Sequence, residues 1–243
     1  MKSFLVDVRN TLVPGHDATH GPLPPLLVIM TLTTGLVDAF SYLTLGHVFV
    51  ANMTGNIVFL GFALAGAQGF SITASLGAIG AFIVGAAFGG RLNSLFAHHR
   101  GQLLSLATFI QAWFFGASVV LAVLSPRLVS GGYRYALIGV LGIAMGLQNA
   151  VARKLAVPDL TTTVLTLTIT GIAADQTVVG GVGSKFGRRI VAISGMFVGG
   201  LIGAVLVLHV AIYYPLLVAL VAVVIVAIAI APFRNSNAEW TKA

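Results

Sequence analysis

Long apolar segments follow one another along almost the whole chain, and few charged residues interrupt them. Residues 39–90 contain no Asp, Glu, Lys or Arg, and neither do residues 190–233. A membrane-spanning helix needs about 20 consecutive apolar residues, so these two runs alone have room for roughly four crossings. The pattern therefore predicts an all-α protein, a polytopic bundle of transmembrane helices.

Eight apolar segments can be separated along the chain, and each is a predicted helix of the bundle. They are residues 25–45, 48–67, 70–90, 103–124, 135–152, 160–174, 190–209 and 213–231. The second and the sixth segments open with a polar cluster, so each is either a full crossing or a broken, re-entrant helix. We expect six to eight crossings and favour eight segments, of which these two are irregular. They form one transmembrane domain over residues 23–233, between aqueous tails at 1–22 and 234–243.

Composition and charge agree with a membrane protein. Charged residues make up only 8% of the chain, against about 25% in soluble proteins. The net charge of +7 does not predict nucleic-acid binding, because the basic residues lie in short links between apolar segments, where they orient a membrane protein. If all eight segments cross, nine Lys and Arg residues fall on the side of the termini and four on the other side. This bias predicts that both termini are cytoplasmic.

Two sequence motifs occur twice in the same order. Residues 35–40 (Gly-Leu-Val-Asp-Ala-Phe) match residues 146–151 (Gly-Leu-Gln-Asn-Ala-Val), and a polar cluster follows each, at residues 52–56 and 159–163. Transporters often carry such repeats. The order predicts an internal duplication with halves at about 25–124 and 135–231, whose four segments superpose in turn. The repeats are parallel if all four segments of a half cross, and inverted if one of them does not.

The same motifs support a family resemblance. The run Gly35–Leu43, the cluster Asn52–Asn56 and the run Gly146–Ala150, followed by Arg153-Lys154 and a threonine cluster, resemble the YoaK family of bacterial inner-membrane proteins, which is classed as a domain of unknown function. The resemblance implies a bacterial inner-membrane location and a single multi-pass domain, and it implies no particular activity. The second cluster departs from the pattern, because its Thr-Gly step comes only at Thr170-Gly171.

Asp38 is the first candidate for a functional residue. It lies about two-thirds of the way along segment 25–45, with apolar residues on both sides. A carboxylate at the bilayer centre costs at least ~2.5 kcal/mol, so it should face the protein interior, be paired or be protonated. The alternative is a position near the membrane surface, because Gly46-His47 follows within two turns.

The first polar cluster is the second candidate. Asn52, Thr54 and Asn56 alternate with other residues, and Gly55 lies among them. Side chains of these types compete with the helix for backbone hydrogen bonds, and glycine loosens it further. The cluster predicts an unwound stretch before a half-helix that starts near Asn56, where free N–H groups favour an anion or a polar group. The alternative is a helix cap at a turn on the membrane surface.

If the halves are related by a pseudo-two-fold axis, these clusters converge in one central site. Asp38 then corresponds to Asn149, and the first polar cluster corresponds to the region of Asp159, Thr161 and Thr163. Asp38 is the predicted proton or cation site, and the amides and hydroxyls are the predicted ligand contacts. The predicted substrate-binding residues are Asp38, Asn52, Thr54, Asn56, Asn149, Thr161 and Thr163.

These features favour a transporter or permease for a small polar solute, with membrane lipids as its other partners. The alternative is a membrane scaffold, or a protein that binds lipids or a partner without transport. No enzyme motif occurs, and the chain has six acidic residues and no cysteine, so we expect neither an enzyme nor a cofactor or metal. Glycines spaced four apart predict close helix packing and leave a homodimer open. These glycines are Gly85 and Gly89, Gly142 and Gly146, and Gly195, Gly199 and Gly203.

Overall fold

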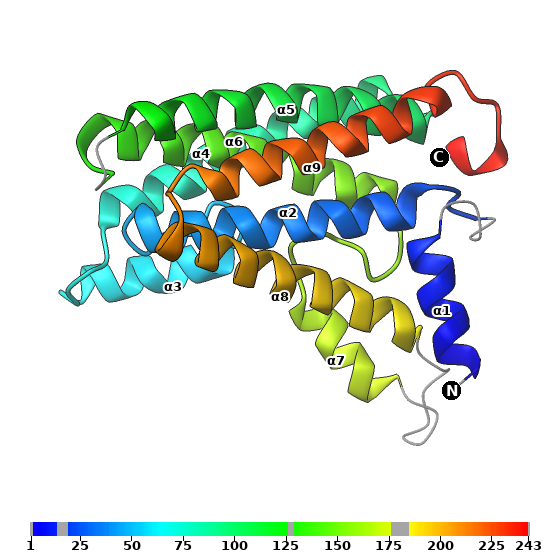
Figure 1. Cartoon of the computed structure of the whole chain (residues 1–243), viewed down its shortest axis with the longest axis horizontal. Coiled ribbons are helices and arrows are strands. Elements are labelled where there is room, and N and C mark those ends of the chain that lie inside the picture. The colour runs from blue at the N-terminus through cyan, green and yellow to red at the C-terminus, as the bar shows by residue number, and fades with distance from the viewer. Residues whose placement is uncertain (1, 14–18, 126–128, 176–184, 243) are drawn as a thin grey trace.

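The computed structural model describes residues 2–13, 19–125, 129–175 and 185–242, and within these ranges the chain is helical, without strands. Six helices are long and apolar enough to cross a membrane (Figure 1). They are α2 (Leu23–Thr44), α4 (Ile72–Leu95), α5 (Arg100–Leu124), α6 (Gly131–Leu155), α8 (Phe186–His209) and α9 (Tyr214–Ile230), which the short turn η2 (Ala231–Phe233) extends. The prediction of an all-helical, polytopic bundle is confirmed.

Two helices are too short to cross, and they correspond to the two irregular segments. Helix α3 (Met53–Leu64) has 12 residues and α7 (Thr166–Ala174) has nine. At 1.5 Å per residue they extend about 18 Å and about 14 Å, whereas the hydrocarbon core of a bilayer is about 30 Å thick. The structure therefore supports six crossings, the lower end of the expected range, and the two segments expected to be irregular are half-helices.

The long helices pack in close pairs, in which glycines meet the backbone of the facing helix. A Cβ atom on Gly85 of α4 would collide with the carbonyl oxygen of Ile143 in α6, and one on Gly199 of α8 would collide with that of Leu32 in α2. Figure 1 shows α2 and α8 side by side, one end of α8 diverging towards α7. The glycine spacing predicted this close packing, and the contacts confirm it within the chain.

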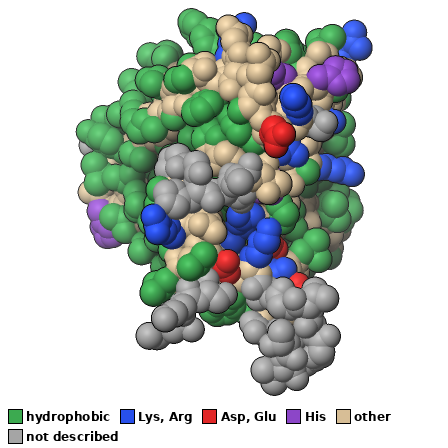
Figure 2. All heavy atoms as spheres, turned by 90° about the vertical axis from the view of Figure 1, so that its right-hand side faces the viewer, with side chains coloured by type: hydrophobic (Ala, Val, Ile, Leu, Met, Phe, Trp, Pro, Cys, Tyr) green, Lys and Arg blue, Asp and Glu red, His purple; other side chains and the backbone are tan. Residues whose placement is uncertain are grey.

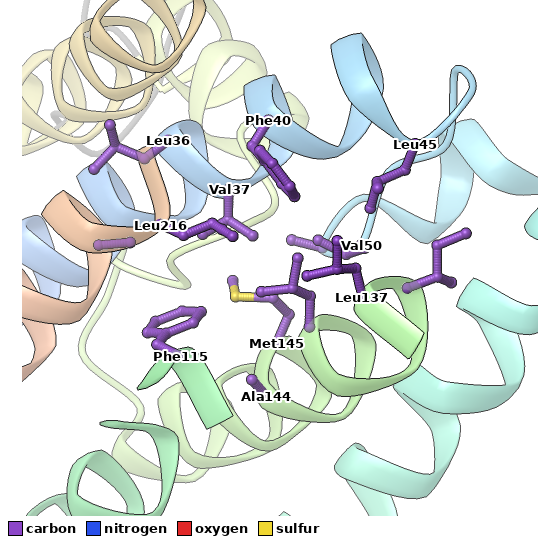
Figure 3. Close-up of a cluster of buried hydrophobic side chains, with 14 of the residues drawn as sticks. Leu36, Val37, Phe40, Leu45, Val50, Phe115, Leu137, Ala144, Met145 and Leu216 are labelled. Atoms are coloured by element: carbon purple, nitrogen blue, oxygen red, sulfur yellow. The ribbon is translucent and has the colours of Figure 1, made fainter. Parts of the chain in front are cut away.

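The largest buried cluster lies where α2, α5, α6 and α9 meet. Figure 3 shows Phe40 and Val37 of α2 facing Met145 of α6, with Phe115 of α5 below them. Val50, from the link between α2 and α3, is also fully buried in this cluster. The link is therefore held inside the bundle, which positions the start of α3.

Polar residues gather at one end of the bundle. There α1 (Lys2–Leu12) runs across the ends of the long helices, and its Phe4 ring lies 5.8 Å from that of Phe186 in α8 (Figure 1). The C-terminal tail folds back at this end, so that Trp240 in the short turn η3 (Glu239–Thr241) is nearly buried. Figure 2 views this end and shows Lys, Arg and acidic side chains close together. The sequence had suggested only aqueous tails for both segments.

The glycine contacts predict a specific loss of stability. Gly85→Ala places a methyl group on the backbone of Ile143, so α4 and α6 must separate, which costs about 1–3 kcal/mol. Gly80→Ala, on the same helix with nothing within 4 Å, is the matched control and should leave stability unchanged or slightly raised. The thermal unfolding midpoint of the purified protein in detergent measures both. Equal midpoints for the two variants would contradict the packing.

Candidate functional site

The link from α2 to α3 leaves helical geometry, and Asp38 binds its backbone. Asp38 Oδ1 accepts hydrogen bonds from the backbone N–H groups of Val50, at 3.2 Å, and Ala51, at 3.0 Å. Inside a membrane no bulk water can satisfy such groups. The carboxylate on α2 therefore holds the link in place, immediately before α3 begins.

Asn56 completes the bracing of this link from the first turn of α3. Its side-chain oxygen accepts from the N–H of Phe49 at 2.9 Å, and its amide nitrogen donates to the carbonyl of the same residue at 2.6 Å. Asn56 is fully buried. Both polar groups of the Asn56 side chain bond the backbone of Phe49, so this predicted site residue has a structural role.

A cavity of about 1040 Å³ lies beside this link. It is lined by α2 and α8 on one side, by the starts of the half-helices α3 and α7, and by single residues of α4 and α6. Both half-helices begin at the cavity, so their N-terminal ends face a common space. Neither start carries a side-chain cap.

Five of the seven predicted site residues line this one cavity, and they come from both halves of the chain. They are Asp38, Asn52, Thr54, Asn149 and Thr163. Asn149 Oδ1 accepts a hydrogen bond from Thr163 Oγ1 at 2.9 Å, so α6 is tied to the link that leads into α7. Thr161 and Asn56 do not line the cavity; Thr161 is exposed and donates to the carbonyl of Val164.

Four aromatic side chains line the cavity, and sequence reasoning did not select them. Tyr42 stacks on Phe49 with ring centres 5.0 Å apart, and Phe59 lies 5.6 Å from Phe49. Phe82 of α4 also lines the cavity. Gly55 makes room for this arrangement, because a Cβ atom there would lie 2.8 Å from the ring of Phe49. The approach of residues 42 and 59 depends on the folded link, which no local sequence pattern specifies.

An arginine holds the second half-helix. Arg189 of α8 forms ion pairs with Asp159 at 2.9 Å, before α7, and with Asp175 at 2.7 Å, at the end of α7. Gly171 makes room for the guanidinium group, since a Cβ atom there would lie 2.6 Å from it. Asp159 and Asp175 therefore fasten α7 to α8 and lie outside the cavity.

A buried amide cluster joins three long helices. Gln111 of α5 donates to Gln148 of α6 at 2.6 Å, and Gln148 donates to Thr34 of α2 at 2.9 Å. All three side chains are at most 1% exposed. Gln148 precedes Asn149, so this cluster sets the rotation of α6 that turns Asn149 toward the cavity. Sequence reasoning did not select Gln111, which is flanked by apolar residues in α5.

The cavity is lined by polar, aromatic and small side chains and by few charged ones. Asp38 is the one carboxylate among its described lining residues, and no Lys, Arg or His joins it there. Within the described ranges, no three His, Cys, Asp or Glu side chains lie close enough together to hold a metal ion. The cavity can offer a solute one carboxylate, amide and hydroxyl groups, and aromatic faces.

The fold and the cavity define a multi-pass integral membrane protein with two half-helices. Residues 26–229 match the family described as "Protein of unknown function (DUF1275)", and the chain belongs to that family. It is 36% identical over 155 residues to "UPF0700 transmembrane protein YoaK" of Bacillus subtilis (strain 168), an alignment that covers 62% of this chain and 65% of that relative. The family predicted from the motifs is thus confirmed. No solved structure matches the chain.

The bracing role of Asn56 can be tested against a neighbour. Asn56→Ala leaves the N–H and the carbonyl of Phe49 without their partner, and a lost buried hydrogen bond costs about 1–3 kcal/mol. Its thermal midpoint should fall, and proteolysis of the link at residues 45–52 should become faster. Thr54→Ala, on the exposed side of the same turn, is the control. A midpoint that falls only in the Thr54 variant would contradict the assignment.

Proposed function

We propose that this protein is a transporter or permease for a small polar solute, which binds between two structurally equivalent halves, and that it is not an enzyme. The observation that carries the proposal is the single cavity that Asp38 and Asn149 both line, each from the helix that opens its half. Polar groups inside a membrane are expensive and commonly mark a solute path. Half-helices that start at such a cavity are a recurring feature of transporters.

The proposed duplication is supported by contacts that recur at matching positions. Gly146 faces the carbonyl of Phe82, and Gly35 faces the carbonyl of Met196. Likewise, Gly85 faces the carbonyl of Ile143, and Gly199 faces the carbonyl of Leu32. In this correspondence α2, α3, α4 and α5 match α6, α7, α8 and α9. Each half then has three crossings, an odd number, so the two repeats have inverted topology.

The same correspondence suggests which parts move. The close pairs α2–α8 and α4–α6 each take one helix from each half, and α7 packs on α8 as α3 packs on α4. The cavity lies between these two units. We infer that solute passes when the units rock against each other, because inverted repeats allow the same packing with the opposite side open.

The orientation follows from the basic residues. With six crossings, eleven Lys and Arg residues fall on the side of the termini and only two, Arg127 and Arg134, on the other side. The eleven are Lys2, Arg9, Arg91, Arg100, Arg153, Lys154, Lys185, Arg188, Arg189, Arg234 and Lys242. This bias is stronger than the nine to four that eight crossings give, and it supports cytoplasmic termini in a bacterial inner membrane.

The six-crossing topology can be tested by cysteine labelling, because the chain has no cysteine of its own. A cysteine in place of His98, between α4 and α5, should react with a membrane-impermeant maleimide only after the cells are opened. A cysteine in place of Gly132, at the start of α6, should react in intact cells. Eight crossings predict the reverse for both positions, so reversed labelling would refute this topology.

The transport proposal is tested by uptake into proteoliposomes. Wild-type protein should take up at least one solute from a panel of small amines, amino acids, sugars and carboxylic acids. Asp38→Asn should lower that uptake at least about tenfold, as expected for a charged hydrogen bond worth 1.5–3 kcal/mol, while Thr161→Ala, outside the cavity, should not. Liposomes that stay inert across the panel would favour a scaffold or a lipid-binding protein.

A further inference from the structure

We propose that the cavity binds an organic cation, with Asp38 as its counter-charge and the aromatic wall as its second contact. This inference rests on the proposed function for its physiological meaning, but the binding step can be tested without transport. Three observations carry it: a carboxylate oxygen without a partner, the absence of any other charged side chain among the described lining residues, and aromatic rings on the same cavity.

Only one of the two carboxylate oxygens of Asp38 accepts hydrogen bonds from the described residues. Both of its hydrogen bonds end on Oδ1, which leaves Oδ2 without a hydrogen-bond partner among the described residues. No described Lys or Arg forms an ion pair with it, whereas Asp159 and Asp175 share Arg189. A carboxylate within a membrane-spanning helix requires compensation of its charge. A ligand cation at Oδ2 supplies that compensation without disturbing the bonds to Val50 and Ala51.

The surroundings of Asp38 select an organic cation over a metal ion. Hard metal ions require several oxygen ligands arranged around one point. Among the described lining residues Asp38 is the one carboxylate, and the side-chain oxygen of Asn149 already accepts a hydrogen bond from Thr163. The other lining residues include aromatic ones, Tyr42, Phe49 and Phe82. Aromatic faces attract cations within about 6 Å of the ring centre, and they contact the alkyl groups of an ammonium ion as well. A volume of about 1040 Å³ also exceeds what a bare ion fills.

The half-helix ends could in principle attract an anion, since each carries about half a positive charge. At α3, however, the carboxylate of Asp38 already binds the N–H groups of Val50 and Ala51, just before the helix start. A full negative charge there outweighs the partial charge of the helix end and repels a second anion. Around Asp38, at the start of α3, the balance of charge therefore favours a cation.

Three probes of nearly one shape separate the effect of charge from that of size. They are choline, its neutral isostere 3,3-dimethylbutan-1-ol, and the anion 3,3-dimethylbutanoate. Titration calorimetry on the purified full-length protein should show binding of choline and of the larger benzyltrimethylammonium. The neutral isostere and the anion should bind at least about tenfold more weakly, the loss expected for one charge-assisted contact.

Variants assign the contacts. Asp38→Asn keeps a side-chain oxygen for Val50 and Ala51 but removes the charge, so choline affinity should fall at least about tenfold without loss of the folded protein. Phe82→Leu, a ring outside the Tyr42 cluster, should weaken binding about threefold. Thr161→Ala, outside the cavity, is the control and should bind as wild type does.

Each outcome decides the inference. Equal binding of choline and the neutral isostere, preferential binding of the anion, or no binding of either cation overturns it. Cation binding that is lost in Asp38→Asn supports it even if proteoliposomes take up no cation, in which case the transport proposal falls alone. Uptake of a neutral solute by a protein that binds no cation leaves transport standing and removes the cation site.

Discussion

The structure depends on how the chain satisfies a non-helical backbone inside a membrane. Between α2 and α3 the backbone lacks the regular hydrogen bonds of a helix. In hydrocarbon an unpaired backbone N–H or C=O group is costly. Asp38 and Asn56 provide the partners, because together they bind the backbone of residues 49–51. Only with that link fixed can α3 begin inside the bundle, and only then does its first turn line a cavity.

The second half solves the same problem with different chemistry. Asn149, at the position that matches Asp38, accepts a hydrogen bond from the Thr163 side chain at 2.9 Å. Arg189 forms ion pairs with Asp159, in the link before α7, and with Asp175, at the end of α7. In the first half, stacked rings around Tyr42 and Phe49 hold α3. The glycine contacts between long helices, by contrast, recur at matching positions. The close helix packing at glycines is thus alike in the two halves, while the side chains that hold the half-helices α3 and α7 in place differ.

Much of the fold could be predicted from the sequence, because the bilayer imposes length and polarity on every crossing. Apolar runs located the six long helices, and glycine spacing located their close contacts. The number of crossings was harder, because segments 48–67 and 160–174 each open with a polar cluster and could be read as full or broken helices. In the structure α3 and α7 start only at Met53 and Thr166. The residue at which a helix starts depends on tertiary hydrogen bonds such as those of Asp38. The hydropathy of the sequence carries no information about these bonds.

The cavity was less predictable than the fold. The repeated motif predicted that Asp38 and Asn149 belong to one site, because equivalent positions in repeats meet near the axis that relates them. Asn56 and Thr161 are as polar as their neighbours, but the direction of each side chain depends on the local turn, and they lie outside the cavity. The aromatic wall was not predicted, because Tyr42 and Phe59 cannot be distinguished in the sequence from ordinary apolar residues of membrane helices.

The unequal halves bear on how such a site works. A site on an axis between two identical halves would carry two carboxylates, which repel each other and would raise the cost of burial. Here the second position is Asn149, so the proposed site holds one negative charge, which one positive charge on a ligand or one proton would balance. In the proposed transport cycle, the packed glycine pairs provide the equivalent contacts that rocking between two states requires, while Asp38 provides the charge. Under this proposal, the residues that would select a solute are different from the glycines that pack the helices, so the cavity can change its specificity without altering the helix contacts on which the fold rests.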